Sequence, residues 1–332
     1  MLTRLNEKLL NYVSKHSPWT NVYGFARSLI ALVTLTLFLF NNTWTIFRPL
    51  AGVPEFPKCS VYPISAFCIL PSDYLPLTKW IVIVLLAVIV SGWRPRYTGI
   101  IHWWIASSLQ NTGSTLDGGE QVATAITLLL IPITLLDTRK WHWQAPQFSN
   151  LRWGQHSSVI AFVFLFAIKV QMAVIYFNAG IARLKNPEWI DGSAVYYYFN
   201  SAMLGFNVTM LSLFKPLLIS PFVFVITWGT TVAELLLAAA LLAPIKHYKW
   251  YFWIGMLLHA LIAVLLGLWT FSAIMIAGLI LSYRDYDNIF HFKWLKKLGD
   301  KLRLSRRERK SQEAMIPGVV QATGIRTPSD VQ

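Results

Sequence analysis

The sequence predicts an all-α membrane protein, built as a polytopic helical bundle of about eight transmembrane helices within a range of six to eight. Of its 332 residues, 55% are hydrophobic and only 13% are charged, whereas soluble domains carry roughly 25% charged residues. Several apolar runs are long enough to cross the ~30 Å of hydrocarbon in a bilayer. The 15 Trp and 13 Tyr residues fit this class because their rings favour the membrane interface. We therefore expect a multi-pass protein of the cell membrane.

The apolar runs divide the chain into spans that are separated by polar or proline-rich loops. Residues 1–24 form a polar, amphipathic segment before the first run. The first six predicted spans cover residues 25–47, 77–93, 98–110, 121–136, 157–184 and 217–242. Between the last two of these, the semi-apolar stretch 196–214 is expected to form a re-entrant or interfacial helix.

The last apolar run covers residues 250–283. As one helix with a rise of ~1.5 Å per residue it would be about 50 Å long, which is too long for a single untilted crossing. We predict two spans that meet near Gly267, which brings the total to eight.

The basic residues predict the orientation of these spans. The formal net charge is +14, and most of the excess lies in alternate loops and in the tail after residue 283. Positively charged loops stay in the cytoplasm, so both termini are expected there. Residues 25–283 then form the transmembrane domain and 284–332 a basic cytoplasmic tail with a disordered end at 311–332. Orientation and contact with anionic lipid account for the charge, so no nucleic-acid partner is expected.

Cys59 and Cys68 lie in one proline-rich loop that this orientation places outside the cell. A pair of this kind in an oxidising compartment usually forms a structural disulfide. Free thiols and a redox-active pair are the alternatives.

Several polar residues fall inside the predicted spans, where ionisable groups are costly and tend to pair or to line a cavity. Lys169 and Gln171 lie midway along the fifth span, Glu234 lies in the sixth, His259 in the seventh and His102 in the third. The sequence predicts an ion pair between Glu234 and Lys169, with a polar cavity in the bundle as the alternative. No His, Cys, Asp and Glu set has the spacing of a zinc or di-iron site, so no metal is predicted.

The stretch "NAGIARLKNPEWIDGSA", residues 178–194, concentrates charged residues at the outer end of the fifth span. Interfacial anchoring accounts for the charges if Arg183 and Lys185 extend to the head groups and Trp189 lies in the aromatic belt. It does not account for the order of the residues.

That order resembles the signature of the HTTM domain, the membrane domain shared with vitamin K-dependent γ-carboxylases. The family shows a Tyr, then Ala-Gly, a Lys, a Trp and a Gly in this order, and residues 176–195 are similar to it through Tyr176, Gly180, Trp189 and Gly192, with Asp191 beside the last. Two softer matches are residues 259–275, which resemble a later His-containing helix, and "GGE" at 118–120. The resemblance covers most of residues 25–282.

One departure from the family pattern concerns Arg183, which takes the place of the motif lysine. In the carboxylases that lysine is the proposed active-site base. A guanidinium stays protonated at physiological pH, so Arg183 is expected to bind an anion rather than abstract a proton. Lys185 is a candidate for a displaced base, although a shift of two residues turns a helical side chain to another face. The carboxylases' large extracytoplasmic domain has no counterpart here, so γ-carboxylation is not expected.

Within the HTTM group, the size of the chain, its basic tail and its external Cys pair resemble the sporulation-delaying protein B family. The resemblance implies a membrane factor that acts at the outer face in the maturation of a secreted peptide toxin. The implied partners are the precursor peptide, a small soluble protein of the same system and membrane lipid. A transporter or export component and a self-protection protein are the alternatives.

Whether such a factor is an enzyme stays open. In an enzymatic version, Arg183 and Lys185 would hold a carboxylate or a lipid-soluble, quinone-like cofactor, although the sequence requires no cofactor. His259 would act as general acid and base, and the carboxylates of the outer turns would handle protons: Asp117, Glu120 and Asp191. In a non-enzymatic version the same cavity would present the precursor to a partner.

Overall fold

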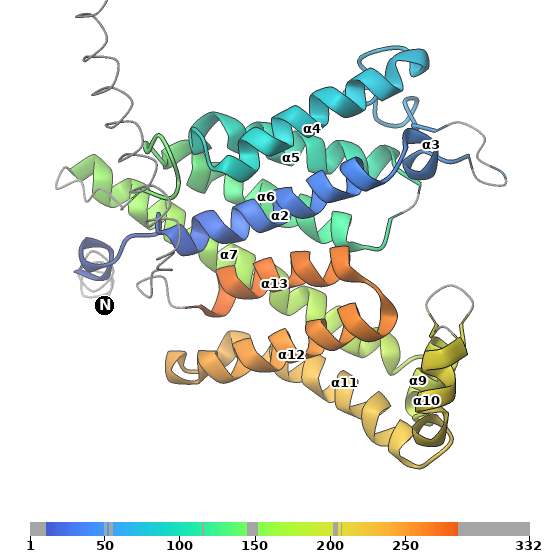
Figure 1. Ribbon diagram of the computed structural model, residues 1–332. Coiled ribbons are helices and arrows are strands. Elements are labelled where there is room, and N and C mark those ends of the chain that lie inside the picture. The colour runs from blue at the N-terminus through green and yellow to red at the C-terminus, as the bar shows by residue number, and fades with distance from the viewer. Residues whose placement is uncertain are drawn as a thin grey trace, which may run out of the picture. The chain divides into compact units, whose positions relative to one another are not determined.

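The computed structural model describes residues 11–49, 52, 56–114, 116–144, 152–201, 205–206 and 208–284, which are almost entirely helical (Figure 1). Of residues 152–154 only the backbone is described. All the described residues belong to one unit that covers residues 1–289, and the second unit, 290–332, lies outside them. The predicted disordered end at 311–332 and nearly all of the predicted basic tail also lie outside the described residues.

Eight long helices form the bundle in the described part of the chain. They are α2 (Asn21–Phe40), α4 (Leu75–Ser91), α5 (Pro95–Thr112), α6 (Gly119–Leu136), α7 (Arg152–Arg183), α11 (Phe222–Ala239), α12 (Tyr248–Leu266) and α13 (Trp269–Tyr283). Six of these described helices are long and apolar enough to cross a membrane, and the two that are not are α5 and α13. The all-α membrane fold is therefore confirmed, while the count of eight spans stays a prediction.

Short helices occupy the connections. They are α3 (Thr43–Ile46), η1 (Ser72–Tyr74), α8 (Pro187–Ile190), α9 (Ala194–Phe199), α10 (Val208–Leu218), η2 (Ala240–Leu242) and η3 (Ile245–His247). The predicted helix at 196–214 corresponds to α9 and α10, which are two short helices rather than one. Their apolar side chains meet in a small cluster formed by Val195, Phe199 and Leu218.

The predicted first span, 25–47, extends too far at its C-terminal end. Helix α2 ends at Phe40 because Asn41 adopts an extended backbone, and the Asn41 amide nitrogen of the side chain donates to the Leu37 carbonyl at 2.9 Å. Asn42 then caps α3 by accepting from the Thr45 backbone N–H. Asparagine favours such capping positions over helix interiors. The break predicted near Gly267 is confirmed, since α12 ends there with φ +71°.

Helix α13 lies at the centre of the bundle and packs against α2, α6, α7 and α12. Every residue from Ala277 to Tyr283 is buried. A helix that is apolar all round belongs in the interior, which explains how a helix of 15 residues can hold the bundle together. On one side of α13 lie α2, α4, α5 and α6, and on the other lie α11 and α12 (Figure 1).

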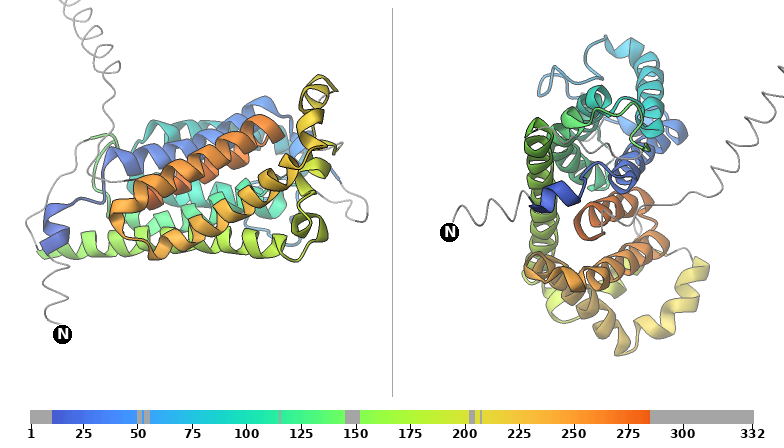
Figure 2. Two further views of the ribbon diagram at one scale, coloured as in Figure 1. Left: turned by 90° about the horizontal axis from the view of Figure 1, so that it is seen from below. Right: turned by 90° about the vertical axis from the view of Figure 1, so that its left-hand side faces the viewer.

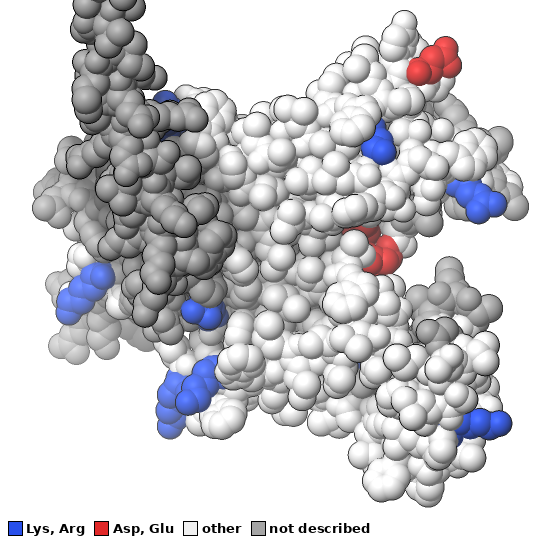
Figure 3. Space-filling model, in the orientation of Figure 1, with Lys and Arg blue, Asp and Glu red and all other residues white. Residues whose placement is uncertain are grey.

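The helices run back and forth between two ends of the bundle (Figures 1 and 2). The terminal end carries the C-terminal end of α13 and the α4–α5, α6–α7 and α11–α12 connections (Figures 1 and 2). The motif end carries residues 184–193, α9, α10, the Cys59–Cys68 loop and the α5–α6 and α12–α13 turns. Between the two ends, the face seen in Figure 3 carries few charged side chains, as expected for a surface against lipid.

Cys59 and Cys68 form a disulfide in the long loop at the motif end. The loop is anchored on the bundle because the Phe67 ring stacks on Phe38, with ring centroids 5.5 Å apart. The Ala66 backbone N–H also donates to the Ser108 hydroxyl of α5 at 2.9 Å.

Candidate functional site

Arg183, the last residue of α7, forms an ion pair with Glu234 of α11 at the motif end. Nη2 of Arg183 lies 2.7 Å from Oε1 of Glu234, and the two side chains are 20% and 7% exposed. Nη1 of Arg183 donates to the Thr230 hydroxyl one turn earlier on α11, at 3.2 Å. The pair therefore joins the end of α7 to the middle of α11.

The predicted ion pair between Glu234 and Lys169 is wrong. Lys169 instead donates to the hydroxyl of Tyr248, the first residue of α12. Its ammonium also lies 5.5 Å from the ring centroid of Tyr283, the last residue of α13. Lys169 and Arg183 are separated by roughly 21 Å along α7, so only one of them reaches the depth of Glu234.

Trp189 encloses the Arg183 guanidinium from the other side. Its ring centroid lies 4.1 Å from Cζ of Arg183, within the range of a cation–π contact. Helix α8 holds the indole there, and Asn186 caps that helix by accepting from the Glu188 backbone N–H. The motif arginine and tryptophan thus form one stacked unit.

A second polar pair lies deeper in the same region. The Tyr176 hydroxyl is 2.8 Å from Nε2 of His259 on α12, and these residues are 1% and 2% exposed. Tyr176 and Arg183 are seven residues apart, so both project from the same face of α7. The two pairs together line the contact of α7 with α11 and α12.

Each pair leaves one buried atom without a hydrogen-bond partner among the described residues. These atoms are Oε2 of Glu234 and Nδ1 of His259. Nearly all buried polar atoms in folded proteins are paired, and at membrane depth an unpaired group is costly. The site therefore offers two polar atoms that a ligand or water could satisfy.

The two motif glycines allow close approach. A Cβ on Gly180 would lie 2.6 Å from Leu235 of α11, so glycine lets α7 and α11 meet next to the ion pair. Gly192 has φ +83°, and a Cβ there would lie 2.3 Å from the Phe224 ring. Both glycines shape the backbone around Arg183 rather than supply chemistry.

Lys185 and Asp191 lie outside this buried set. Both are exposed in the loop after α7. Asp191 accepts from the Ser193 hydroxyl at 2.6 Å and from its backbone N–H at 2.8 Å. These hydrogen bonds hold the pKa of the Asp191 carboxyl below its usual value, so it stays ionised as a turn-capping group.

Asp117 and Glu120 link the α5–α6 turn to α13. Asp117 accepts from the Thr270 hydroxyl and from the Phe271 backbone N–H, the latter at 3.0 Å. Glu120 is buried and accepts from the Asp117 backbone N–H at 3.3 Å. Asp117 thus ties the α5–α6 turn to the start of α13, and Glu120 supports that turn.

The two remaining predicted residues stand apart from the pairs. His102 is buried on α5, and its Nε2 has no hydrogen-bond partner in the described part of the chain. Gln171 is partly exposed on α7.

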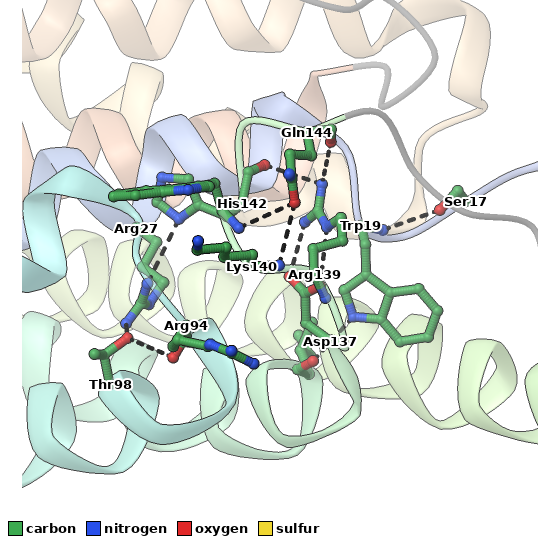
Figure 4. A network of polar contacts seen from close by, with 12 residues as sticks. Ser17, Trp19, Arg27, Arg94, Thr98, Asp137, Arg139, Lys140, His142 and Gln144 are labelled. Atoms are coloured by element: carbon green, nitrogen blue, oxygen red, sulfur yellow. Dashed lines mark hydrogen bonds and ion pairs between the residues drawn. The ribbon is translucent and has the colours of Figure 1, made fainter.

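The terminal end carries a polar network that the sequence analysis missed (Figure 4). Arg139 and Asp137 form a buried ion pair at 2.8 Å, and Arg139 also donates to the His142 carbonyl at 2.9 Å. The His142 ring bonds Ser28 through Nε2 at 3.2 Å and contacts Arg27 through Nδ1 at 3.5 Å. Two sequence features could have indicated this network: Arg27 lies inside the first apolar run, and the polar loop "DTRKWHWQ" at 137–144 offers partners for it.

Burial is the main reason why the pKa of the His142 imidazole lies well below its usual value of 6.5, and the positive charges of Arg27 and Arg139 lower it further. His142 is therefore neutral, and it pins the 137–144 loop to α2.

Two proteins of Bacillus subtilis (strain 168) resemble this chain along nearly its whole length. The uncharacterized protein YitO is 40% identical over 300 residues, which cover 90% of this chain and 96% of YitO. The sporulation-delaying protein SdpB is 37% identical over 297 residues, which cover 88% of this chain and 91% of SdpB. No protein-family model and no solved structure matches the chain, so the likeness of residues 176–195 to the HTTM signature stays a prediction. The identity to SdpB, sustained from end to end, shows that the chain belongs to the SdpB family.

Proposed function

We propose that this protein is a membrane factor required for the production of a secreted peptide toxin, and that it acts on the toxin's precursor at the motif end, on the outer side of the membrane. The observation that carries the proposal is the 37% identity to SdpB, a sporulation-delaying protein, over 88% of the chain. The predicted orientation supports the outer location because the basic connections lie at the opposite end.

The two polar pairs indicate which chemical groups of the precursor the site would bind. Oε2 of Glu234 is an acceptor that lacks a donor among the described residues, and a peptide backbone supplies N–H donors that suit it. Arg183 already neutralises the other carboxylate oxygen, so an anionic group would have to compete with Glu234 for the guanidinium. We therefore favour an N–H donor of the precursor as the group that Glu234 meets, with Arg183 as a positioning residue.

His259 is the group best placed for proton transfer in an enzymatic version. Its Nε2 bonds the Tyr176 hydroxyl and its Nδ1 has no partner in the described residues, so the ring has one nitrogen for a fixed neighbour and one for a ligand. Arg183 does not exchange protons at physiological pH. In a non-enzymatic version the same groups bind the precursor and present it to a small soluble partner.

The test is mass analysis of the peptide secreted by cells that carry the wild-type protein, no protein, or Glu234→Gln, His259→Ala and Arg183→Ala. We expect the mature peptide to disappear in the deletion strain and to fall at least tenfold in Glu234→Gln at equal protein level. Lys215→Gln, an exposed change on α10, is the control and should leave the peptide unchanged.

The masses separate the alternatives. A mass change beyond cleavage that is present with the wild-type protein and lost in the site variants would indicate chemistry at the site. An intact mature peptide retained inside the cell would indicate export instead. Normal secretion with death of the producing cells would indicate self-protection, and either of these two results would contradict the proposal.

A further inference from the structure

A cavity of about 720 Å³ opens at the terminal end, far from the motif residues. It lies between α7, α12, the last residues of α13 and the helical segment at residues 11–15. Its size falls within the roughly 300 to 1,000 Å³ that ligand pockets occupy. None of its lining residues belongs to the two polar pairs of the candidate site.

The cavity is lined by basic side chains. These are His16, Lys169, Lys246, Lys249 and Arg284, and no Asp or Glu is among the described residues that line it. Such an excess of one charge attracts an anion. Because the predicted orientation puts this end in the cytoplasm, the cavity faces the leaflet in which anionic lipids create a negative surface potential.

Lys169 makes the strongest case for an anion because it is 6% exposed. Its ammonium lies 3.7 Å from the Tyr248 ring centroid and 5.5 Å from that of Tyr283. No carboxylate pairs with it among the described residues. Two aromatic rings and a hydroxyl replace only part of the hydration of a buried ammonium, and an anion in the cavity would complete its environment.

The position of Lys169 along α7 matches the depth of a lipid head group. It contacts the first residue of α12 and lies close to the last residue of α13, so it is level with the points where those two helices end. Helix α7 begins at Arg152, so it continues beyond Lys169 toward the terminal end by 17 residues, roughly 25 Å.

Most of the remaining lining residues are apolar, and some of them are exposed on the outer surface of the bundle. Phe162, Phe166, Phe252 and Trp253 line it. Phe166 is 59% exposed and Trp253 is 62% exposed. A ligand that fits both parts has a negatively charged head and an apolar tail.

We propose that this cavity binds an anionic glycerophospholipid, with the phosphate of the head group beside Lys169, Lys246 and Lys249 and the acyl chains along Phe166 and Trp253. The site is separate from the one that acts on the precursor, and the proposal does not depend on the function of that site.

The test is native mass spectrometry of the full-length protein in a neutral detergent, titrated with phosphatidylglycerol. The variant Lys246→Gln/Lys249→Gln changes two exposed residues and should fold normally. At about fivefold in affinity for each lysine near a phosphate, we expect the double variant to bind roughly 25-fold more weakly. Lys169→Gln should also weaken binding, and the double variant keeps the test decisive if Lys169→Gln misfolds.

The matched control is Arg48→Gln/Lys215→Gln, which removes two exposed charges at the motif end and should leave the affinity unchanged. Phosphatidylcholine, which has no net charge, should bind at least tenfold more weakly than phosphatidylglycerol. Equal binding of the two lipids, or an unchanged affinity in Lys246→Gln/Lys249→Gln, would overturn the proposal. Displacement of the lipid by millimolar inorganic phosphate would assign the cavity to a soluble phosphate compound and overturn the lipid assignment.

Discussion

Two buried histidines, one at each end of the bundle, have opposite hydrogen-bonding environments. At the terminal end, both ring nitrogens of His142 have neighbours, with Ser28 at 3.2 Å and Arg27 at 3.5 Å. At the motif end, His259 bonds only Tyr176, and its Nδ1 has no partner in the described residues. A histidine whose two ring nitrogens both have hydrogen-bond partners serves a structural role. A histidine with one unpaired ring nitrogen is able to bind a ligand through it.

Two ion pairs among the described residues, Asp137–Arg139 and Arg183–Glu234, differ in the same way. Arg139 contacts both oxygens of Asp137, two residues away in the same loop, at 2.9 and 2.8 Å. Arg183 contacts one oxygen of Glu234 on another helix, and the second oxygen is unpaired in the described part of the chain. Saturated networks rigidify a fold, and incomplete ones carry a cost that function has to justify. We therefore expect the Asp137–Arg139 pair to serve the structure, and the Arg183–Glu234 pair to serve the activity proposed above.

The largest expected effect comes from Arg183→Ala. It leaves the buried Glu234 carboxylate without its counter-charge, which costs about 3–5 kcal/mol in free energy of unfolding. Toxin production should be lost. Denaturant unfolding of the purified protein, with a peptide assay in cells, measures both quantities.

The double variant Arg183→Ala/Glu234→Ala is the control for this change. Because it removes the uncompensated charge as well, it should be more stable than Arg183→Ala alone, while toxin production stays lost. Additive losses of stability would show that the two residues do not act as a pair.

The next largest effect is expected from His142→Ala at the terminal end. His142→Ala leaves the Ser28 hydroxyl and the Arg27 guanidinium with fewer partners and should cost about 2–3 kcal/mol in free energy of unfolding. Toxin production per folded molecule should be unchanged. His259→Ala leaves the buried Tyr176 hydroxyl without its partner, so it should cost a similar amount of stability, but it should also cause a large loss of production per folded molecule. Denaturant unfolding and the peptide assay measure the two variants. If both variants lowered toxin production per folded molecule equally, the two histidines would not differ in role.

Much of the fold could be predicted from the apolar runs and their breaks. The end of α12 at Gly267 is one example, since a glycine within an apolar run of excessive length marks the turn. The end of α2 at Phe40 was missed because "FNNTW" reads as a continuation of the apolar run. Only the capping contacts of Asn41 and Asn42 show that the helix stops there.

The sequence singled out the four residues of the two polar pairs, but it did not predict which cation pairs with Glu234. Lys169 and Arg183 lie on nearly the same face of α7, because 14 residues make almost four full turns. Helical periodicity therefore cannot decide which of them meets Glu234. The decision depends on how far α11 is shifted along α7, and that shift follows from tertiary packing, such as the approach of Gly180 to Leu235.

A smaller effect should appear in the pH dependence of stability. The pKa of His142 is lowered in the folded protein, so the unfolded chain binds a proton more readily. The stability that His142 contributes is complete above pH 6.5 and is lost as the pH falls below that value, by up to about 1.4 kcal/mol per pH unit. His142→Gln should flatten the curve between pH 5 and 6.5, as measured by denaturant unfolding. A slope that is unchanged in this variant would contradict the assignment.

The smallest effect is expected from Lys185→Gln, two residues after Arg183. Lys185 is exposed, so its loss should change the free energy of unfolding by less than about 0.5 kcal/mol and leave toxin production intact. Arg183→Lys provides the contrast, because it keeps the charge but not the two donors that meet Glu234 and Thr230. If Lys185→Gln abolished production while Arg183→Lys preserved it, the amine of Lys185 would be the working group. The site would then depend on an exposed base rather than on the buried ion pair.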